Sequence, residues 1–229
     1  GGGRGAPGSG TPGSTFSRPT DVAWDKAGNI YITDGIGNTN RVAKYDKDGK
    51  FIRQWGSTGS ENGQFNGVKS LAIDAQDNVW VLSRPRTLKP DQSASAAPAI
   101  LVFDPAGNFL RSWGGPGSGF EWPEREHGLH VGYKGYGGGG GNNCPARNLP
   151  GLKAVADDQL LKFTPEGKFV MQIGRSGRSQ GNGDTFNLRQ PADAWVHPGT
   201  NEVFVADGYG NHRVVVFDAD TGKFKRMWG

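Results

Sequence analysis

Two side chains occur in sequence settings that favour ligand chemistry. Arg84 follows an apolar run and opens a long insertion, residues 87–98. A guanidinium can hold a carboxylate through two parallel hydrogen bonds, so Arg84 predicts recognition of a peptide C-terminus or an acidic metabolite. The alternative is an ion pair with a neighbouring structural unit. Tyr209 lies between Gly208 and Gly210, where its hydroxyl can act as a hydrogen-bond donor or an acid/base group.

The histidines form a third group of candidates. A catalytic zinc ion takes three protein ligands and keeps one open position. The chain has four histidines, and His127 and His130 are three residues apart. That spacing predicts opposite faces of a strand, and therefore two imidazoles that do not share a metal. His127 remains either a metal ligand or an ordinary loop or core histidine.

These candidates belong to a repeated sequence unit. Four segments end alike, at Gln54-Trp55-Gly56, Ser112-Trp113-Gly114, Gln172-Ile173-Gly174 and Met227-Trp228-Gly229. Each ending follows the same series of features, as in 41–51 and 213–224. The series is an apolar run, then a turn that contains Asp or Thr and Gly, then an aromatic residue. Such a phrase predicts an antiparallel hairpin. A second apolar pair lies earlier in most units, so each unit is expected to hold four short strands.

Four-stranded units in series predict an all-β fold, a β-propeller. We expect four blades, at about 15–56, 64–114, 123–174 and 186–229, within a six-bladed ring; the alternative is a small ring. Residues 1–14 are expected to be a glycine-rich tail of a preceding blade or a linker. The run 137–141 contains five glycines where a strand is due. It is either a flexible loop or a stretch in which glycine stands in place of unidentified side chains.

The composition excludes several classes of protein. The net charge is +4, and the basic residues are scattered, so no nucleic-acid partner is expected. The single cysteine, Cys144, cannot form an intrachain disulfide. No apolar run approaches the roughly 18 residues of a membrane span, and no signal peptide is visible.

The repeat endings and the phrase Val205 to Val214 resemble NHL repeats, which form propellers, commonly with six blades. Residues 63–229 are similar, in order, to the catalytic propeller of peptidyl-α-hydroxyglycine α-amidating lyase. That resemblance implies cleavage of a C-terminal hydroxyglycine to a peptide amide and glyoxylate. It also implies a zinc ion held by three histidines, a structural calcium ion, and an extracytoplasmic location that is periplasmic or secreted.

The resemblance assigns roles to four residues. Arg84 corresponds to the catalytic arginine and Tyr209 to the catalytic tyrosine, both near the substrate. His127 corresponds to one zinc ligand, within Glu126-His127-Gly128-Leu129. Leu129 corresponds to a residue whose carbonyl binds calcium.

The chain also departs from that family. Lys69 stands where a resembling motif has a histidine, and a protonated lysine repels a zinc ion. The resemblance places the other two zinc histidines after Gly229, and Gly210 replaces a half-cystine.

Two functions therefore stay open. One is a binding or scaffold module that uses its central-channel face for a peptide, a small carboxylate or a protein partner. The other is a metal-dependent lyase that cleaves a carbon–nitrogen bond in a carboxylate-bearing substrate, so enzymatic activity is undecided.

Overall fold

A computed structural model describes residues 13, 15–35, 39–88, 96–143, 153 and 155–229. The first sheet contains β1 (Pro19–Trp24), β2 (Ile30–Asp34), β3 (Arg41–Tyr45) and β4 (Phe51–Trp55). The second contains β5 (Val68–Ile73), β6 (Val79–Ser83), β7 (Ile100–Phe103) and β8 (Phe109–Trp113). The third contains β9 (Glu126–Val131), β10 (Gly137–Gly141), β11 (Leu160–Phe163) and β12 (Phe169–Ile173). The fourth contains β13 (Asp193–His197), β14 (Glu202–Asp207), β15 (Arg213–Asp218) and β16 (Phe224–Trp228).

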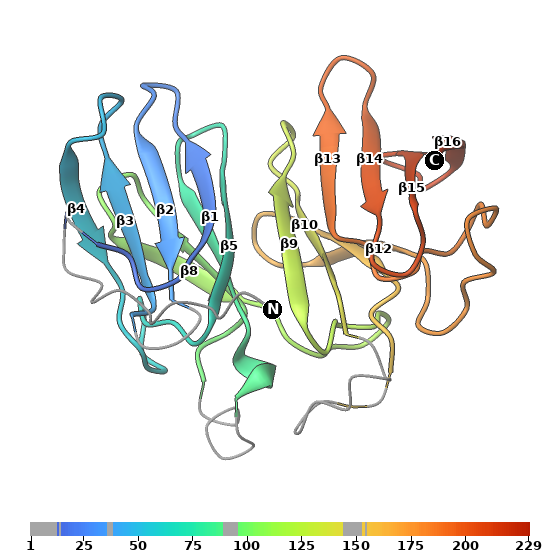
Figure 1. The fold of residues 1–229 in the computed structure, drawn as a ribbon, viewed down its shortest axis with the longest axis horizontal. Helices are drawn as coiled ribbons and strands as arrows, with labels where there is room; N and C mark the ends of the chain where they lie inside the picture. The colour runs from blue at the N-terminus through green and yellow to red at the C-terminus, as the bar shows by residue number, and fades with distance from the viewer. Residues whose placement is uncertain (1–12, 14, 36–38, 89–95, 144–152, 154) are drawn as a thin grey trace, which may run out of the picture.

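Each sheet is an antiparallel meander, and the four sheets are arranged radially. The strands pair in chain order within every sheet. The first strands contact one another in series, β1 with β5, β5 with β9, and β9 with β13 (Figure 1). The prediction of an all-β propeller is confirmed. The predicted tail 1–14 lies outside the described residues apart from position 13, and so does Cys144.

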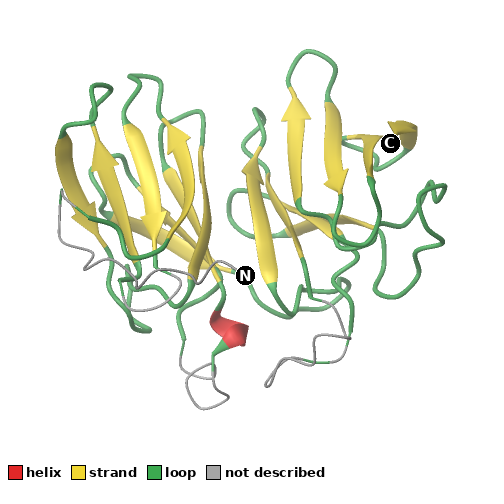
Figure 2. Cartoon of the chain, in the orientation of Figure 1, coloured by secondary structure: helices red, strands yellow, loops and turns green. Residues whose placement is uncertain are grey.

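Apart from these strands, the described residues contain a single 3-10 turn, η1 (Pro85–Thr87), drawn in red in Figure 2. Among the described residues, none of the helical structure is long and apolar enough to cross a bilayer.

The repeated Trp-Gly endings and the hairpin glycines pack against each other across sheet boundaries. A Cβ placed on Gly107 would lie 2.9 Å from the Trp55 ring, and one on Gly167 would lie 2.5 Å from Trp113. Both glycines have a φ of +84°, a conformation that glycine adopts without strain. Each turn therefore uses glycine to fit the tryptophan of the preceding sheet, which explains why the two motifs recur together.

We expect Gly167→Ala to lower the free energy of unfolding by about 1–3 kcal/mol more than Gly49→Ala, because it overpacks a closed contact. Gly49 is a matched control, since its φ is +81° and a Cβ added there would meet no atom within 4 Å. Urea unfolding of both variants measures the difference. Equal losses would mean that the Trp113 contact contributes nothing to stability.

The five-glycine run is a strand, β10, so of the two alternatives the flexible loop is wrong. Gly137–Gly140 pair with Leu160–Phe163 of β11, and the run also pairs with β9 on its other edge. Hydrogen-bonded neighbours on both edges hold a backbone whose own strand propensity is low.

Candidate functional site

Arg84 directly follows β6, at the boundary between the second and third sheets. The residue is only 6% exposed. Its Nε donates a hydrogen bond to the carbonyl oxygen of Glu126 in β9. Its backbone N–H donates to the carbonyl of Asn66, 3.0 Å away. Burial, and then the charge of Arg125, lowers the pKa of Arg84 to about 10. These contacts fix the guanidinium beside the first residues of β9.

His127 and Tyr209 form a hydrogen-bonded pair across the boundary of the third and fourth sheets. The Tyr209 hydroxyl lies 2.9 Å from His127 Nε2, and the two rings meet edge to face. His127 Nδ1 lies 2.9 Å from the carbonyl oxygen of Ala192. Because a carbonyl only accepts, Nδ1 carries the proton, and Nε2 accepts from the Tyr209 hydroxyl. Burial, and then the charges of Lys69 and Arg84, lowers the pKa of His127 to about 4.

The two histidines of β9 both point towards the fourth sheet. His130 Nε2 accepts the backbone N–H of Val196 at 3.1 Å, whereas His127 contacts Ala192 of the same sheet. The prediction of opposite faces is wrong because the pairing of β9 and β10 shifts register between Gly139 and Gly141. Such a bulge breaks the two-residue alternation of a strand.

Lys69 and Arg125 join Arg84 at this end of the sheets. Lys69 lies on β5, which packs against β9, and Arg125 directly precedes β9. Burial, and then the charge of Arg84, lowers the pKa of Lys69, and the charge of Arg125 acts in the same direction. Three basic side chains thus lie close enough to affect one another's ionisation, and they lie next to the His127–Tyr209 pair.

Two carboxylates flank these basic groups on the first strands of their sheets. Asp21 Oδ2 accepts hydrogen bonds from Ser70 Oγ at 2.5 Å and from the backbone N–H of Leu71 at 3.1 Å. Burial raises the pKa of Asp193, and both carboxylates interact electrostatically with Lys69. The first strands of the sheets therefore hold a mixed cluster of basic and acidic groups.

Leu129 lies apart from these polar groups. It pairs with Gly139 in the β9–β10 ladder, and its side chain belongs to the buried cluster around Trp80. The structure thus brings Arg84, His127 and Tyr209 together at one end of the sheets and leaves the side chain of Leu129 in the core.

The residues at this site do not fit a three-histidine zinc ion. Both ring nitrogens of His127 are engaged by other groups. The register shift that contains His127 in β9 has counterparts in the first strands of the two preceding sheets. The corresponding residue is Lys69 in β5 and Thr20 in β1. Within the part of the chain that the structure describes, no three His, Cys, Asp or Glu side chains cluster so as to hold a metal.

Sequence reasoning missed Arg125 and Glu126 as parts of this site. Glu126 is buried, and its carboxylate accepts the indole N–H of Trp122 at 2.8 Å. Burial raises the pKa of Glu126 to about 7. Both residues directly precede His127 in the sequence, and this position could have identified them. Residues at the start of a strand lie at the same end of the sheet as the residue that follows them.

The chain is partly similar in sequence to amidating enzymes. No family model matches it. Peptidylglycine alpha-amidating monooxygenase of Rattus norvegicus is 42% identical over 77 residues, which cover 33% of this chain and 8% of that protein. Form B of that enzyme in Xenopus laevis is 41% identical over 75 residues, which cover 30% of this chain and 8% of that protein. The match thus spans less than a tenth of the length of these curated relatives.

Solved structures share the fold over more than nine tenths of the chain. A gluconolactonase of Xanthomonas campestris has a TM-score of 0.61 at 15% identity, covering 94% of this chain and 63% of that one. Hydrazine synthase of Kuenenia stuttgartiensis has a TM-score of 0.59 at 12% identity, covering 95% and 50%. Virginiamycin B lyase of Staphylococcus aureus has a TM-score of 0.54 at 13% identity, covering 93% and 56%. At these identities the likeness shows the fold alone, and the chain is a β-propeller protein.

Proposed function

We propose that this propeller is a binding module that holds a carboxylate-bearing ligand, a peptide C-terminus or a small acid, on its central-channel face. The observation that carries the proposal is the convergence of Lys69, Arg84 and Arg125 beside the His127–Tyr209 pair. Basic groups that are partly withdrawn from water bind a carboxylate more strongly than exposed ones, because the surrounding dielectric is lower. Tyr209 is 46% exposed and lies at the same end as the basic groups, so its hydroxyl would add a neutral hydrogen bond.

Calorimetric titration with an N-acetylated dipeptide and with its C-terminal amide tests this function. The free acid is expected to bind, and Lys69→Met to weaken it about 10–100-fold through loss of a charge-assisted hydrogen bond. Lys47→Met is the control, since that side chain is 68% exposed in a hairpin turn. The proposal is wrong if the amide binds as tightly as the acid, or if the two lysine variants bind alike.

A second candidate is a carbon–nitrogen lyase, favoured by the match to the amidating enzymes. In this function Arg84 would bind the substrate carboxylate and Tyr209 would assist proton transfer, while His127 would be a zinc ligand. The engaged nitrogens of His127 and the presence of Lys69 count against the zinc ion. Metal analysis of the purified full-length protein separates the two functions. Stoichiometric zinc that is lost in His127→Ala would support the lyase, and zinc-free protein would contradict it.

We also propose that the blades are of NHL type and belong to a six-bladed ring, with the boundaries given above. Exposed tryptophans on the outer faces of the first and fourth sheets support further blades there: Trp24 is 58% exposed, Trp195 49% and Trp228 50%. A calcium ion at the Leu129 carbonyl and an extracytoplasmic location remain predictions from resemblance.

A further inference from the structure

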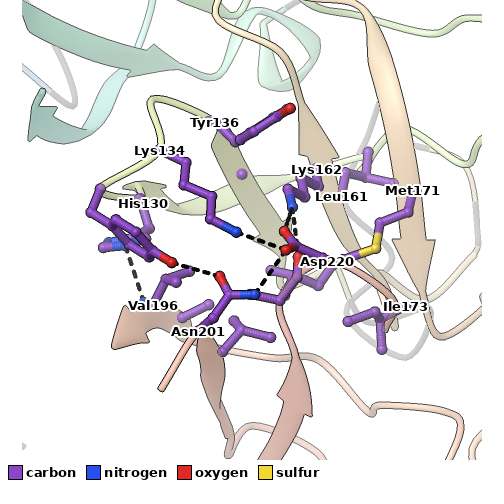
Figure 3. Close-up of a pocket in the computed structure, with 18 residues that line it drawn as sticks. His130, Lys134, Tyr136, Leu161, Lys162, Met171, Ile173, Val196, Asn201 and Asp220 are labelled. Carbon is purple, nitrogen blue, oxygen red and sulfur yellow. Dashed lines mark hydrogen bonds and ion pairs between the residues drawn. The ribbon is translucent and has the colours of Figure 1, made fainter. Parts of the chain in front are cut away.

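A cavity lies between the third and fourth sheets, at the opposite end of β9 from Arg84. Its volume is about 60 Å³, and it is open on one side. Figure 3 shows the apolar side chains of Met171, Ile173 and Val196 among its lining residues, together with the ion-paired Lys162 and Asp220. Gly137 and Gly138 of the glycine strand form another part of the lining.

The strand registers explain why this space is empty. Ala23 pairs with Tyr31, Ala72 with Trp80, His130 with Gly138, and Trp195 with Phe204. The same position in the second strand of each sheet thus holds an aromatic residue in the first, second and fourth sheets. Of the four sheets, only the third has a glycine, Gly138, at this position.

The aromatic residues at this position fill the boundary to the following sheet. Tyr31 is fully buried in a cluster with Leu71 and Val79 of the second sheet. Trp80 is fully buried in a cluster with Leu129 and Val131 of the third sheet. Gly138 occupies the equivalent place facing the fourth sheet, so the cavity lies where a ring is missing.

The polar partner of the missing ring is absent as well. The Tyr31 hydroxyl donates to Asp25 at 3.0 Å, and Trp80 Nε1 donates to Asp74 at 2.9 Å. Gly132 takes the place of these aspartates in the third sheet, because its N–H closes the hairpin to Tyr136 as theirs do in the first two hairpins. An occupant therefore meets an apolar wall and needs no buried hydrogen-bond partner.

Charged groups and the aromatic ring of Tyr136 also line the cavity. Lys162 Nζ lies 4.5 Å from the centroid of Tyr136 and pairs with Asp220 at 3.3 Å. Lys134 pairs with the same carboxylate at 2.7 Å. The contact of Lys162 with Tyr136 resembles that of Lys44 with Tyr31 in the first sheet, where the ammonium lies 4.9 Å from the ring centroid.

We propose that this cavity binds a small planar aromatic molecule, which takes the place of the Tyr31 or Trp80 side chain of the other boundaries. The cavity is smaller than the roughly 150 Å³ cavity that encloses a benzene molecule. The aromatic ring therefore enters edge first, and its other edge stays at the open side of the cavity. A side chain at position 138 cannot supply the ring, because its Cβ would lie 2.8 Å from the Leu161 carbonyl oxygen.

Thermal unfolding with indole as the probe tests the site. At ten times its Kd, indole is expected to raise the Tm by about 3–5 °C. Ala194→Leu should bind indole at least about tenfold more weakly, because Ala194 lines the cavity. The variant should fold, since the register places Leu71 and Leu129 at the same position in the second and third sheets.

Two controls keep the result interpretable. Ala27→Leu makes the same change in an exposed turn and should bind indole as the natural chain does. Lys69→Met, at the other end of the ring, should also leave indole binding unchanged, so this result is independent of the carboxylate site. The proposal is overturned if indole gives no Tm shift, or if Ala194→Leu shows the same shift as Ala27→Leu.

Discussion

Asparagine in place of Asp207 is expected to lower the free energy of unfolding by about 3–5 kcal/mol, because it leaves the buried charge of Arg213 uncompensated. The Arg213 Nε to Asp207 Oδ2 distance is 2.8 Å, and both side chains are almost completely buried. Asp207 Oδ1 also accepts the backbone N–H of Arg189 at 2.7 Å, which ties the fourth sheet to its entry loop. Urea denaturation with a two-state fit measures the loss.

The exposed pair of Lys47 and Asp48 provides the matched control. Its N–O distance is also 2.8 Å, but the two side chains are 68% and 72% exposed. Asp48→Asn should change the free energy of unfolding by less than about 1 kcal/mol, since water screens such a pair. If Asp207→Asn lost no more than Asp48→Asn, the buried pair would not be a structural element of the blade.

The Asp-Gly motif is a case in which sequence and structure agree for a physical reason. Its occurrence at Asp34-Gly35 and Asp207-Gly208 indicates a structural turn, whereas the following residue varies. In the structure Asp34 pairs with Arg41 at 3.0 Å, as Asp207 does with Arg213. In both sheets an arginine follows the Asp-Gly carboxylate six or seven residues later. This pattern is visible in sequence, so this part of the fold could be predicted.

The details of the site could not be predicted in the same way. In the sequence, only the resemblance to the amidating lyase links Arg84, His127 and Tyr209 to one substrate site. The sequence does not reveal the bulge that turns His127 and His130 to the same side, since a register shift depends on how β9 pairs with β10. Nor does it reveal that Tyr209 engages His127 Nε2, a contact between residues 82 positions apart.

The glycine strand shows the limit of local propensity. Five glycines predict a poor strand because they lose the most backbone entropy on ordering. Pairing of β10 with β9 and β11 on its two edges outweighs that cost. The missing side chains affect packing instead, because they leave a cavity beside Gly138.

Alanine in place of Trp80 is expected to lower the free energy of unfolding by about 3–5 kcal/mol, as it does for other buried tryptophans. Trp80 is fully buried between the second and third sheets, and its ring meets Trp113 edge to face. The Arg111 guanidinium lies 5.3 Å from its centroid. Thermal and urea unfolding measure the loss, with Phe186→Ala as the control because Phe186 is 78% exposed. That control should stay within about 0.5 kcal/mol.

The same variant connects stability to the proposed aromatic site. Trp80→Ala removes from the second boundary the kind of ring that Gly138 lacks at the third, so added indole should recover part of the lost Tm. The natural chain is the reference for this measurement. It has one cavity proposed to bind an aromatic ring, whereas the variant has two. A loss no larger than that of Phe186→Ala would show that boundary aromatics do not hold the sheets together. The comparison of Tyr31, Trp80 and Gly138 would then no longer support a ligand at the third boundary.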